Sequence, residues 1–245
     1  MSKQIIDRFA TSSELQHAAA VSIVRFLSEA IQLRGMATLC LSGGSTPKAV
    51  YELLADEHSL DWTKVHFFWG DERFVPPTHP ESNFLMATDA FLQKLSIPDA
   101  NIHRIEAERP PAEAAERYES ELRTFFRLKD DELPRFDVTL LGLGEDGHTA
   151  SLFPGTAILH ETQRLVAEVY VEKFKAYRIS LTYPVLNNSR VVMFLVSGSG
   201  KASILHEIFE GERGRYPAQQ IQPSDGTLYW LIDKEAASHL SDSLA

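Results

Sequence analysis

Residues 36–47 read Met36-Ala-Thr-Leu-Cys-Leu-Ser-Gly-Gly-Ser-Thr-Pro47, an apolar run of strand length that passes through two glycines into residues typical of a helix start. Proline suits the first turn of a helix because an N–H at that position would have no partner, and Ser45 or Thr46 can cap the same end. The stretch therefore predicts a β-strand followed directly by an α-helix.

The same alternation of strand and helix patterns continues along the chain. Several apolar runs are unbroken, as expected of parallel strands that are buried on both faces. The pattern predicts an α/β fold with a mainly parallel central sheet, and one domain over residues 1–245, because no linker-like stretch divides the chain. Strands are expected at 36–41, 65–69, 136–141, 165–171, 178–181, 191–196 and 228–232. Helices are expected at 13–33, 47–55, 83–94, 112–126, 201–209 and near the C-terminus, with long loops at 70–82 and 211–225.

Composition and charge exclude several classes of protein. The net charge of −10, without any basic run, opposes a surface that binds nucleic acid. The N-terminal residues lack the apolar core of a signal peptide, and the longest purely apolar run, 191–196, is too short to span a membrane. We therefore expect a cytoplasmic protein without membrane or nucleic-acid partners, either a monomer or a small homo-oligomer. Cys40, the single cysteine, is interpreted as a buried strand residue.

Ligands of open α/β sheets bind outside the carboxyl ends of the strands, so the residues that follow each strand are informative. Gly43 and Gly44 allow a ligand to approach the backbone, and Ser45 lies at the predicted helix N-terminus, which attracts anions. These residues predict a phosphate cradle; the alternative is a tight turn with ordinary capping. After the next strand, Asp71 and Arg73 are suited to binding sugar hydroxyls and an anion, the alternative being a solvated loop.

The loop after residues 136–141 reads Gly142-Leu-Gly-Glu-Asp-Gly147 and formally matches a dinucleotide fingerprint. Glu145 and Asp146 in this loop would face the pyrophosphate of a bound dinucleotide, and no long amphipathic helix follows. We therefore reject that interpretation. Histidine titrates near neutral pH, and a nearby carboxylate can orient it. The loop therefore favours His148 as a general base with Asp146 beside it, against the alternative of a structural histidine.

Two further cations complete the predicted site. Arg178 opens a short strand, and Lys201 follows a Gly-Ser-Gly turn at a helix start, which suits a phosphate. Lys201 is not a P-loop lysine, because Leu195 stands where that motif needs glycine. The sequence contains neither a G-x-S-x-G elbow nor metal-ligand spacings, so a water molecule activated by histidine, without a metal, fits what remains.

Together these motifs resemble the 6-phosphogluconolactonases of the glucosamine-6-phosphate isomerase/6-phosphogluconolactonase family. They run in family order across nearly the whole chain, and as a set they are highly specific. The matching pieces are Leu41-Ser-Gly-Gly-Ser-Thr-Pro47, Trp69-Gly-Asp-Glu-Arg-Phe-Val-Pro76, His79-Pro-Glu-Ser-Asn83, Leu141-Gly-Leu-Gly-Glu-Asp-Gly-His-Thr-Ala-Ser-Leu-Phe-Pro154, Arg178-Ile-Ser-Leu-Thr182, Pro217-Ala-Gln and Trp230-Leu-Ile-Asp233. The chain departs from the family at Lys175-Ala-Tyr177, where prolines are common, and at Tyr216.

The resemblance implies a three-layer αβα fold similar to that of the glucosamine-6-phosphate deaminases. It implies hydrolysis of 6-phospho-D-glucono-1,5-lactone to 6-phospho-D-gluconate in the oxidative pentose phosphate pathway, with no cofactor and no covalent intermediate. By position, His148 and Asp146 would activate the water. Arg178 and Lys201 would hold the phosphate with the Gly43-Gly44 loop, whereas Asp71 and Arg73 would line the sugar side.

Two other functions stay open at this point. One is a sugar-phosphate deaminase or isomerase, in which Asp71 would be the base and His148 would assist ring opening. The other is a sugar-phosphate sensor that binds without turnover.

Overall fold

The computed structural model describes residues 3–241, and its central feature is a seven-stranded sheet. All neighbouring strands in this sheet are parallel. The order across the sheet is β1 (Lys3–Phe9), β10 (Thr227–Asp233), β9 (Val191–Val196), β6 (Val138–Leu141), β2 (Ala37–Leu41), β3 (Val65–Trp69) and β5 (Ile102–His103). The predicted mainly parallel sheet is thereby confirmed.

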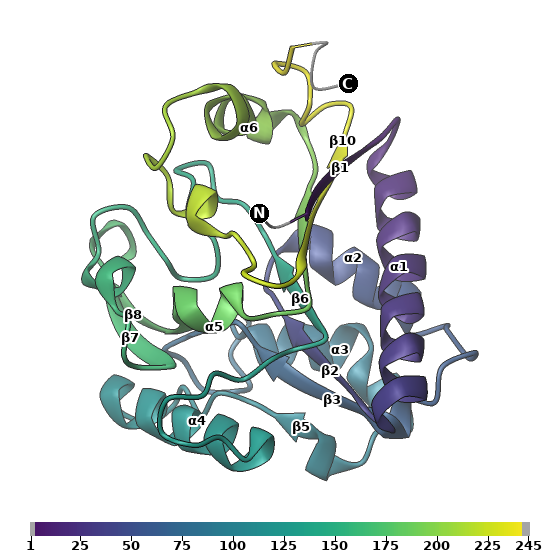
Figure 1. The fold of residues 1–245 in the computed structure, drawn as a ribbon, viewed down its shortest axis with the longest axis vertical. Coiled ribbons are helices and arrows are strands. Elements are labelled where there is room, and N and C mark those ends of the chain that lie inside the picture. The colour runs from purple at the N-terminus through teal and green to yellow at the C-terminus, as the bar shows by residue number, and fades with distance from the viewer. Residues whose placement is uncertain (1–2, 242–245) are drawn as a thin grey trace.

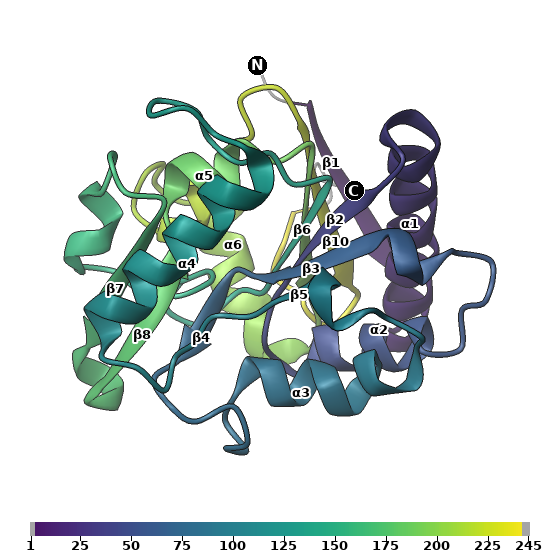
Figure 2. The same ribbon diagram turned by 90° about the horizontal axis from the view of Figure 1, so that it is seen from below.

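Helices cover both faces of the sheet, which gives the three layers (Figures 1 and 2). On one side lie α1 (Ser12–Arg34) and α2 (Ser45–Leu54), and on the other α5 (Tyr183–Asn187) and α6 (Ala202–Glu210). Leucine, isoleucine and alanine side chains three or four residues apart form the buried stripe of α1. The helix begins at the Thr11 cap and ends at Gly35, whose φ is 81°. Two further helices are α3 (Asn83–Ala90) and α4 (Pro111–Phe126).

A second, three-stranded antiparallel sheet stands beside the central one, next to α4 (Figure 2). Its order is β4 (Asp71–Arg73), β8 (Ala176–Leu181) and β7 (Val166–Val171). Gly70 joins the two sheets, because its N–H donates to Leu41 of β2 and its carbonyl accepts from Leu181 of β8. Two of the strands expected from apolar patterning thus belong to this separate sheet, since patterning does not reveal which strands pair.

Several other expectations need correction. The loop expected over 70–82 contains β4, and β1, β5 and α5 were missed because they are short or only half-buried. The helix expected near the C-terminus is absent from the described residues, where 234–239 form turns after β10; residues 242–245 lie outside them. None of the helices within 3–241 has the length and apolar character needed to cross a membrane.

Candidate active site

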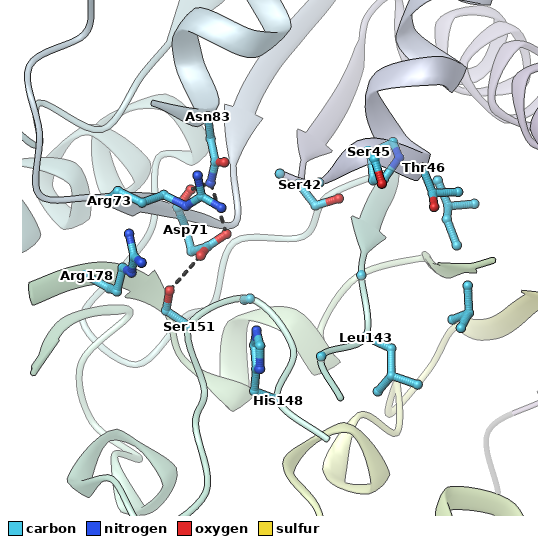
Figure 3. Close-up of a pocket in the computed structure, with 18 of the residues that line it drawn as sticks. Ser42, Ser45, Thr46, Asp71, Arg73, Asn83, Leu143, His148, Ser151 and Arg178 are labelled. Carbon is cyan, nitrogen blue, oxygen red and sulfur yellow. Dashed lines mark hydrogen bonds between the residues drawn. The ribbon is translucent and has the colours of Figure 1, made fainter. Parts of the chain in front are cut away.

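A cavity of about 370 Å³ lies where the carboxyl ends of the central strands meet the small sheet (Figure 3). Its walls come from the segments after β2, β3, β6 and β9, and from β8 and the turn before it. Eight of the nine residues predicted for the site line it: Gly43, Gly44, Ser45, Asp71, Arg73, His148, Arg178 and Lys201. Asp146, the ninth, stands behind His148 and contacts its ring.

His148 and Asp146 form a hydrogen-bonded pair in the loop after β6. Oδ1 of Asp146 contacts Nδ1 of His148 and also accepts the His148 main-chain N–H at 3.3 Å. Burial by itself would raise the pKa of Asp146, but the hydrogen bond and charge of His148 together with Lys173 outweigh burial and lower that pKa. An anionic Asp146 favours the tautomer in which Nδ1 carries the proton, so that Nε2 is free to accept one.

The glycines of this loop allow His148 and Asp146 to pair, and they do not form a nucleotide-binding turn. Gly144 donates its N–H to the His148 carbonyl at 2.8 Å, and Gly147, at φ 76°, closes the turn onto the Gly144 carbonyl at 2.9 Å. A Cβ at Gly144 would collide with Nδ1 of His148. The positions of the ring and of Asp146 therefore require glycine at 144.

The His148 ring lies against one wall of the cavity. It stacks on Phe153 with ring centroids 4.0 Å apart and points into the open space below Asp71 and Ser42 (Figure 3). Within residues 3–241, Nε2 has no hydrogen-bond partner, in contrast to Nδ1. Nε2 is thus available to a water molecule or substrate in the cavity.

Asp71 is held by two polar neighbours that sequence reasoning did not assign to the site. Ser151 donates its hydroxyl to Oδ2 of Asp71 at 2.6 Å, and Asn83 donates its amide to the Asp71 carbonyl at 2.9 Å. Both neighbours line the cavity and are nearly completely buried. Each of these two residues lies inside a motif on which the family resemblance rests, so the sequence did contain a signal for both. A Cβ at Gly43 would collide with the Asn83 amide, so that glycine also leaves room for this network.

Glu72 does not join Asp71 at the site, although the sequence places the two carboxylates side by side. Successive strand residues point to opposite faces, and Glu72 turns toward the start of α3. There it accepts hydrogen bonds from the N–H groups of Asn83 and Phe84 and from the Ser82 hydroxyl. Burial raises the pKa of Glu72 and these donors oppose the rise. Glu72 is therefore a helix-capping residue.

Two arginines face the cavity from paired strands. Arg73 and Arg178 stand opposite each other in the β4–β8 register. Burial and the charge of Arg73 lower the pKa of Arg178, whose guanidinium carbon lies 5.3 Å from the centroid of the Phe174 ring. Neither arginine has a carboxylate ion-pair partner in the described part of the chain. Two neighbouring cations without a direct carboxylate partner attract an anionic group.

A second positive region lies across the cavity, at two helix starts. Ser45 and Thr46 begin α2, whose first turn contains no acidic side chain, and Figure 3 shows them opposite Arg73 and Arg178. Lys201 precedes α6 in a turn that Asp233 holds by accepting the Gly198 N–H at 3.1 Å. Helix N-termini bind anions through free N–H groups and the helix dipole. Arg178 thus stands beside Arg73 in the small sheet, and Lys201 lines the same cavity from the segment after β9.

The arrangement offers acid–base and anion-binding chemistry. Across residues 3–241, no three histidine, cysteine, aspartate or glutamate side chains are placed to hold a metal ion together. The groups that the cavity presents are one imidazole backed by a carboxylate, one buried carboxylate and two cationic regions.

Comparison with known proteins agrees with these observations. The family model described as glucosamine-6-phosphate isomerases/6-phosphogluconolactonase matches residues 10–230. A 6-phosphogluconolactonase from Synechocystis is 44% identical over 238 residues, covering 96% of this chain and 98% of the relative. The structure of 6-phosphogluconolactonase from Trypanosoma brucei has a TM-score of 0.87 at 31% identity and covers 98% of this chain and 100% of its own. A monomeric glucosamine-6-phosphate deaminase shares the fold, with a TM-score of 0.80 at 22% identity over 98% of this chain and 100% of its own.

Proposed function

The chain belongs to the glucosamine-6-phosphate isomerase/6-phosphogluconolactonase family, and we propose that it hydrolyses 6-phospho-D-glucono-1,5-lactone to 6-phospho-D-gluconate in the oxidative pentose phosphate pathway. The observation that carries the proposal is the His148–Asp146 pair at a cavity with two cationic regions, in a chain that matches 6-phosphogluconolactonases over nearly its full length. A single phosphorylated ring fits that set of groups, because it carries one dianion and one reactive carbonyl.

In the proposed reaction, Nε2 of His148 takes a proton from water while the water oxygen attacks the C1 carbonyl. Asp146 keeps the proton on Nδ1 and stabilises the imidazolium that forms. The tetrahedral intermediate then collapses, the bond between C1 and the ring oxygen breaks, and the imidazolium returns the proton to that oxygen. The product is the open-chain acid, and no covalent bond to the protein is made.

The two cationic regions have separate tasks in this proposal. Lys201 and the N-terminal N–H groups of α2 hold the phosphate. Arg73 and Arg178 face the lactone end, where negative charge develops on the carbonyl oxygen and where the carboxylate product appears. Asp71, oriented by Ser151, accepts a hydrogen bond from a sugar hydroxyl. Phosphate binding far from the carbonyl would fix the ring against the base.

One assay tests the proposal. The disappearance of 6-phosphogluconolactone is followed against its spontaneous rate, in parallel with the lactone that lacks the phosphate. We expect a much stronger acceleration for the phosphorylated lactone than for the lactone that lacks the phosphate. No acceleration of either lactone, or equal acceleration of both, would contradict the proposal. Release of ammonia from glucosamine 6-phosphate would instead support the deaminase reaction, with Asp71 as base.

The finer expectations from the sequence stay predictions. These are one domain over 1–245, a cytoplasmic location, and a monomer or small homo-oligomer.

A further inference from the structure

The hairpin between β7 and β8 ends in a short turn that touches the proposed catalytic pair. Residues Glu172–Phe174 form a single turn of 3-10 helix, and Lys175 closes it in the left-handed region at φ 49° with its N–H on the Glu172 carbonyl at 3.1 Å. The turn is thus a hydrogen-bonded unit at the end of two strands that pair along six residue pairs. A unit of this kind can restrain what it touches.

Lys173 supplies the first contact. Its Nζ lies 3.3 Å from Oδ2 of Asp146, the oxygen that does not contact the His148 ring. With both carboxylate oxygens engaged, Asp146 cannot rotate away from the imidazole without breaking an ion pair. In the described residues, Lys173 and His148 are the only ion-pair partners of Asp146.

Phe174 supplies the second contact, from the adjacent position. Its ring packs edge-on against Phe153 with centroids 5.8 Å apart, and Phe153 is the ring on which His148 stacks. The Phe174 ring also lies beside the Arg178 guanidinium group. Of two neighbouring residues in one turn, Lys173 therefore contacts Asp146 directly, and Phe174 contacts both the ring that supports His148 and one of the cavity arginines.

We propose that Lys173 is a positioning residue for the reaction, which holds the Asp146 carboxylate against His148 while Phe174 fixes the turn on the cavity wall. The inference rests on the proposed function. Lys173 does not line the cavity, so it acts through Asp146 and not on the substrate. An exposed ion pair contributes little to stability, and its expected effect is on the geometry and protonation of the pair.

The charged groups around His148 determine the sign of the pH effect. They are Asp146 and Glu145 on its own loop, Lys173 on the hairpin turn, and Asp71, Arg73, Arg178 and Lys201 around the cavity. Removing the positive charge of Lys173 removes a repulsion and so favours the imidazolium form of His148 over the neutral form. The acid limb of kcat/KM, where the neutral base becomes protonated, should then move to higher pH.

The test compares Lys173→Met with Lys175→Met. Lys175 lies in the same exposed turn and gives the same change of charge, but it has no ion pair among residues 3–241. For Lys173→Met we expect a fall in kcat of roughly 3- to 10-fold, a fraction of what a general base contributes, with KM within about twofold of the parent value. The acid limb should shift upward by roughly 0.2–0.7 pH unit. Lys173→Arg should restore both quantities, and Lys175→Met should leave both unchanged.

Equal behaviour of the two methionine variants would overturn the inference, as would a fall in kcat that follows a lowered melting temperature without any shift of the pH profile. An NMR titration of the His148 ring in the same variants does not depend on turnover. If the parent protein failed to hydrolyse the phosphorylated lactone, the proposed function would fail. The titration would still decide whether Lys173 acts on the pair.

Discussion

Ser151 and Asp71 are separated by 80 positions in the chain, and the Ser151 hydroxyl donates to Oδ2 of Asp71 at 2.6 Å inside the cavity. Ser151 belongs to the loop that carries His148, whereas Asp71 begins β4 in the small sheet. The bond therefore ties the loop with the proposed base to the strand with the proposed sugar-binding carboxylate. Ala150, at φ 46°, places Ser151 there at the cost of a left-handed backbone in a residue other than glycine.

Replacing Ser151 with alanine should weaken substrate binding and lower stability together. Asp71 would lose its buried donor, and we expect KM to rise roughly three- to tenfold and the free energy of unfolding to fall by about 1–3 kcal/mol. Steady-state kinetics and urea denaturation measure the two effects. Ser189→Ala is the control, because Ser189 is equally buried and bonds to Thr139 instead of a cavity residue. Ser189→Ala should lower stability without changing KM. The same rise in KM in both variants would contradict a specific role of Ser151 in substrate binding.

Replacing His148 with asparagine should remove most of the activity and leave the fold intact. The amide cannot take up a proton at neutral pH, so kcat should fall by about 10²–10⁴-fold. His160→Asn is the matched control, since His160 is exposed and does not line the cavity. Near-normal turnover of His148→Asn, with the melting temperature of the parent, would show that another group is the base.

Variants of Lys201 and Arg178 should separate the two cationic regions. Lys201→Met should lower kcat/KM for the phosphorylated lactone by roughly 10- to 100-fold, the effect of losing one hydrogen bond to a charged group, and leave the unphosphorylated lactone unaffected. Arg178→Met should lower kcat/KM for both lactones, because Arg178 faces the carbonyl end in the proposal. Equal losses of kcat/KM on both lactones for Lys201→Met would show that Lys201 does not bind the phosphate.

Gly144→Ala should impair catalysis by displacing the base. The added methyl group would collide with Nδ1 of His148 and with the Asp146 carboxylate, so the ring must leave its place beside Asp146. We expect a fall in kcat of at least about tenfold, since small displacements of catalytic groups are costly. Gly70→Ala is the control, because a Cβ there meets its nearest atom at an ordinary 3.5 Å. A fully active Gly144→Ala would refute the proposed geometry.

The stability of the protein should carry a pH signature of Asp146. Its pKa in the folded state is lowered, so its contribution is complete above the unfolded value of about 3.9 and is lost as the pH falls through the folded value. The difference in melting temperature between the parent and Asp146→Asn should be present at about pH 5 and shrink as the pH falls below the unfolded value. A difference that stays the same down to pH 3 would mean that the carboxylate is not stabilised in the fold.

Local patterns in the chain were enough to predict the class of fold and the position of the site along the chain. Buried parallel strands need unbroken apolar runs, and glycines are needed where the backbone turns left-handed or a ligand approaches closely. Both requirements are local, so the strand of residues 36–41 with its Gly43-Gly44 turn, and the loop of His148, could be identified from single stretches. The family resemblance came from the same stretches, and the comparisons agree with it.

Which of these side chains contact one another depends on how the strands pair in the folded protein. Asp71 and Glu72 are equivalent in the sequence, and the alternation of β4 directs the first into the cavity and the second onto α3. Arg178 stands beside Arg73 because β8 pairs with β4 in a separate antiparallel sheet. Pairing and register depend on contacts between residues about 80 to 110 positions apart, which no local pattern encodes. The contact of Ser151 with Asp71 exists for the same reason, and the contact of Lys173 with Asp146, 27 positions apart, depends on where the β7–β8 hairpin lies against the His148 loop.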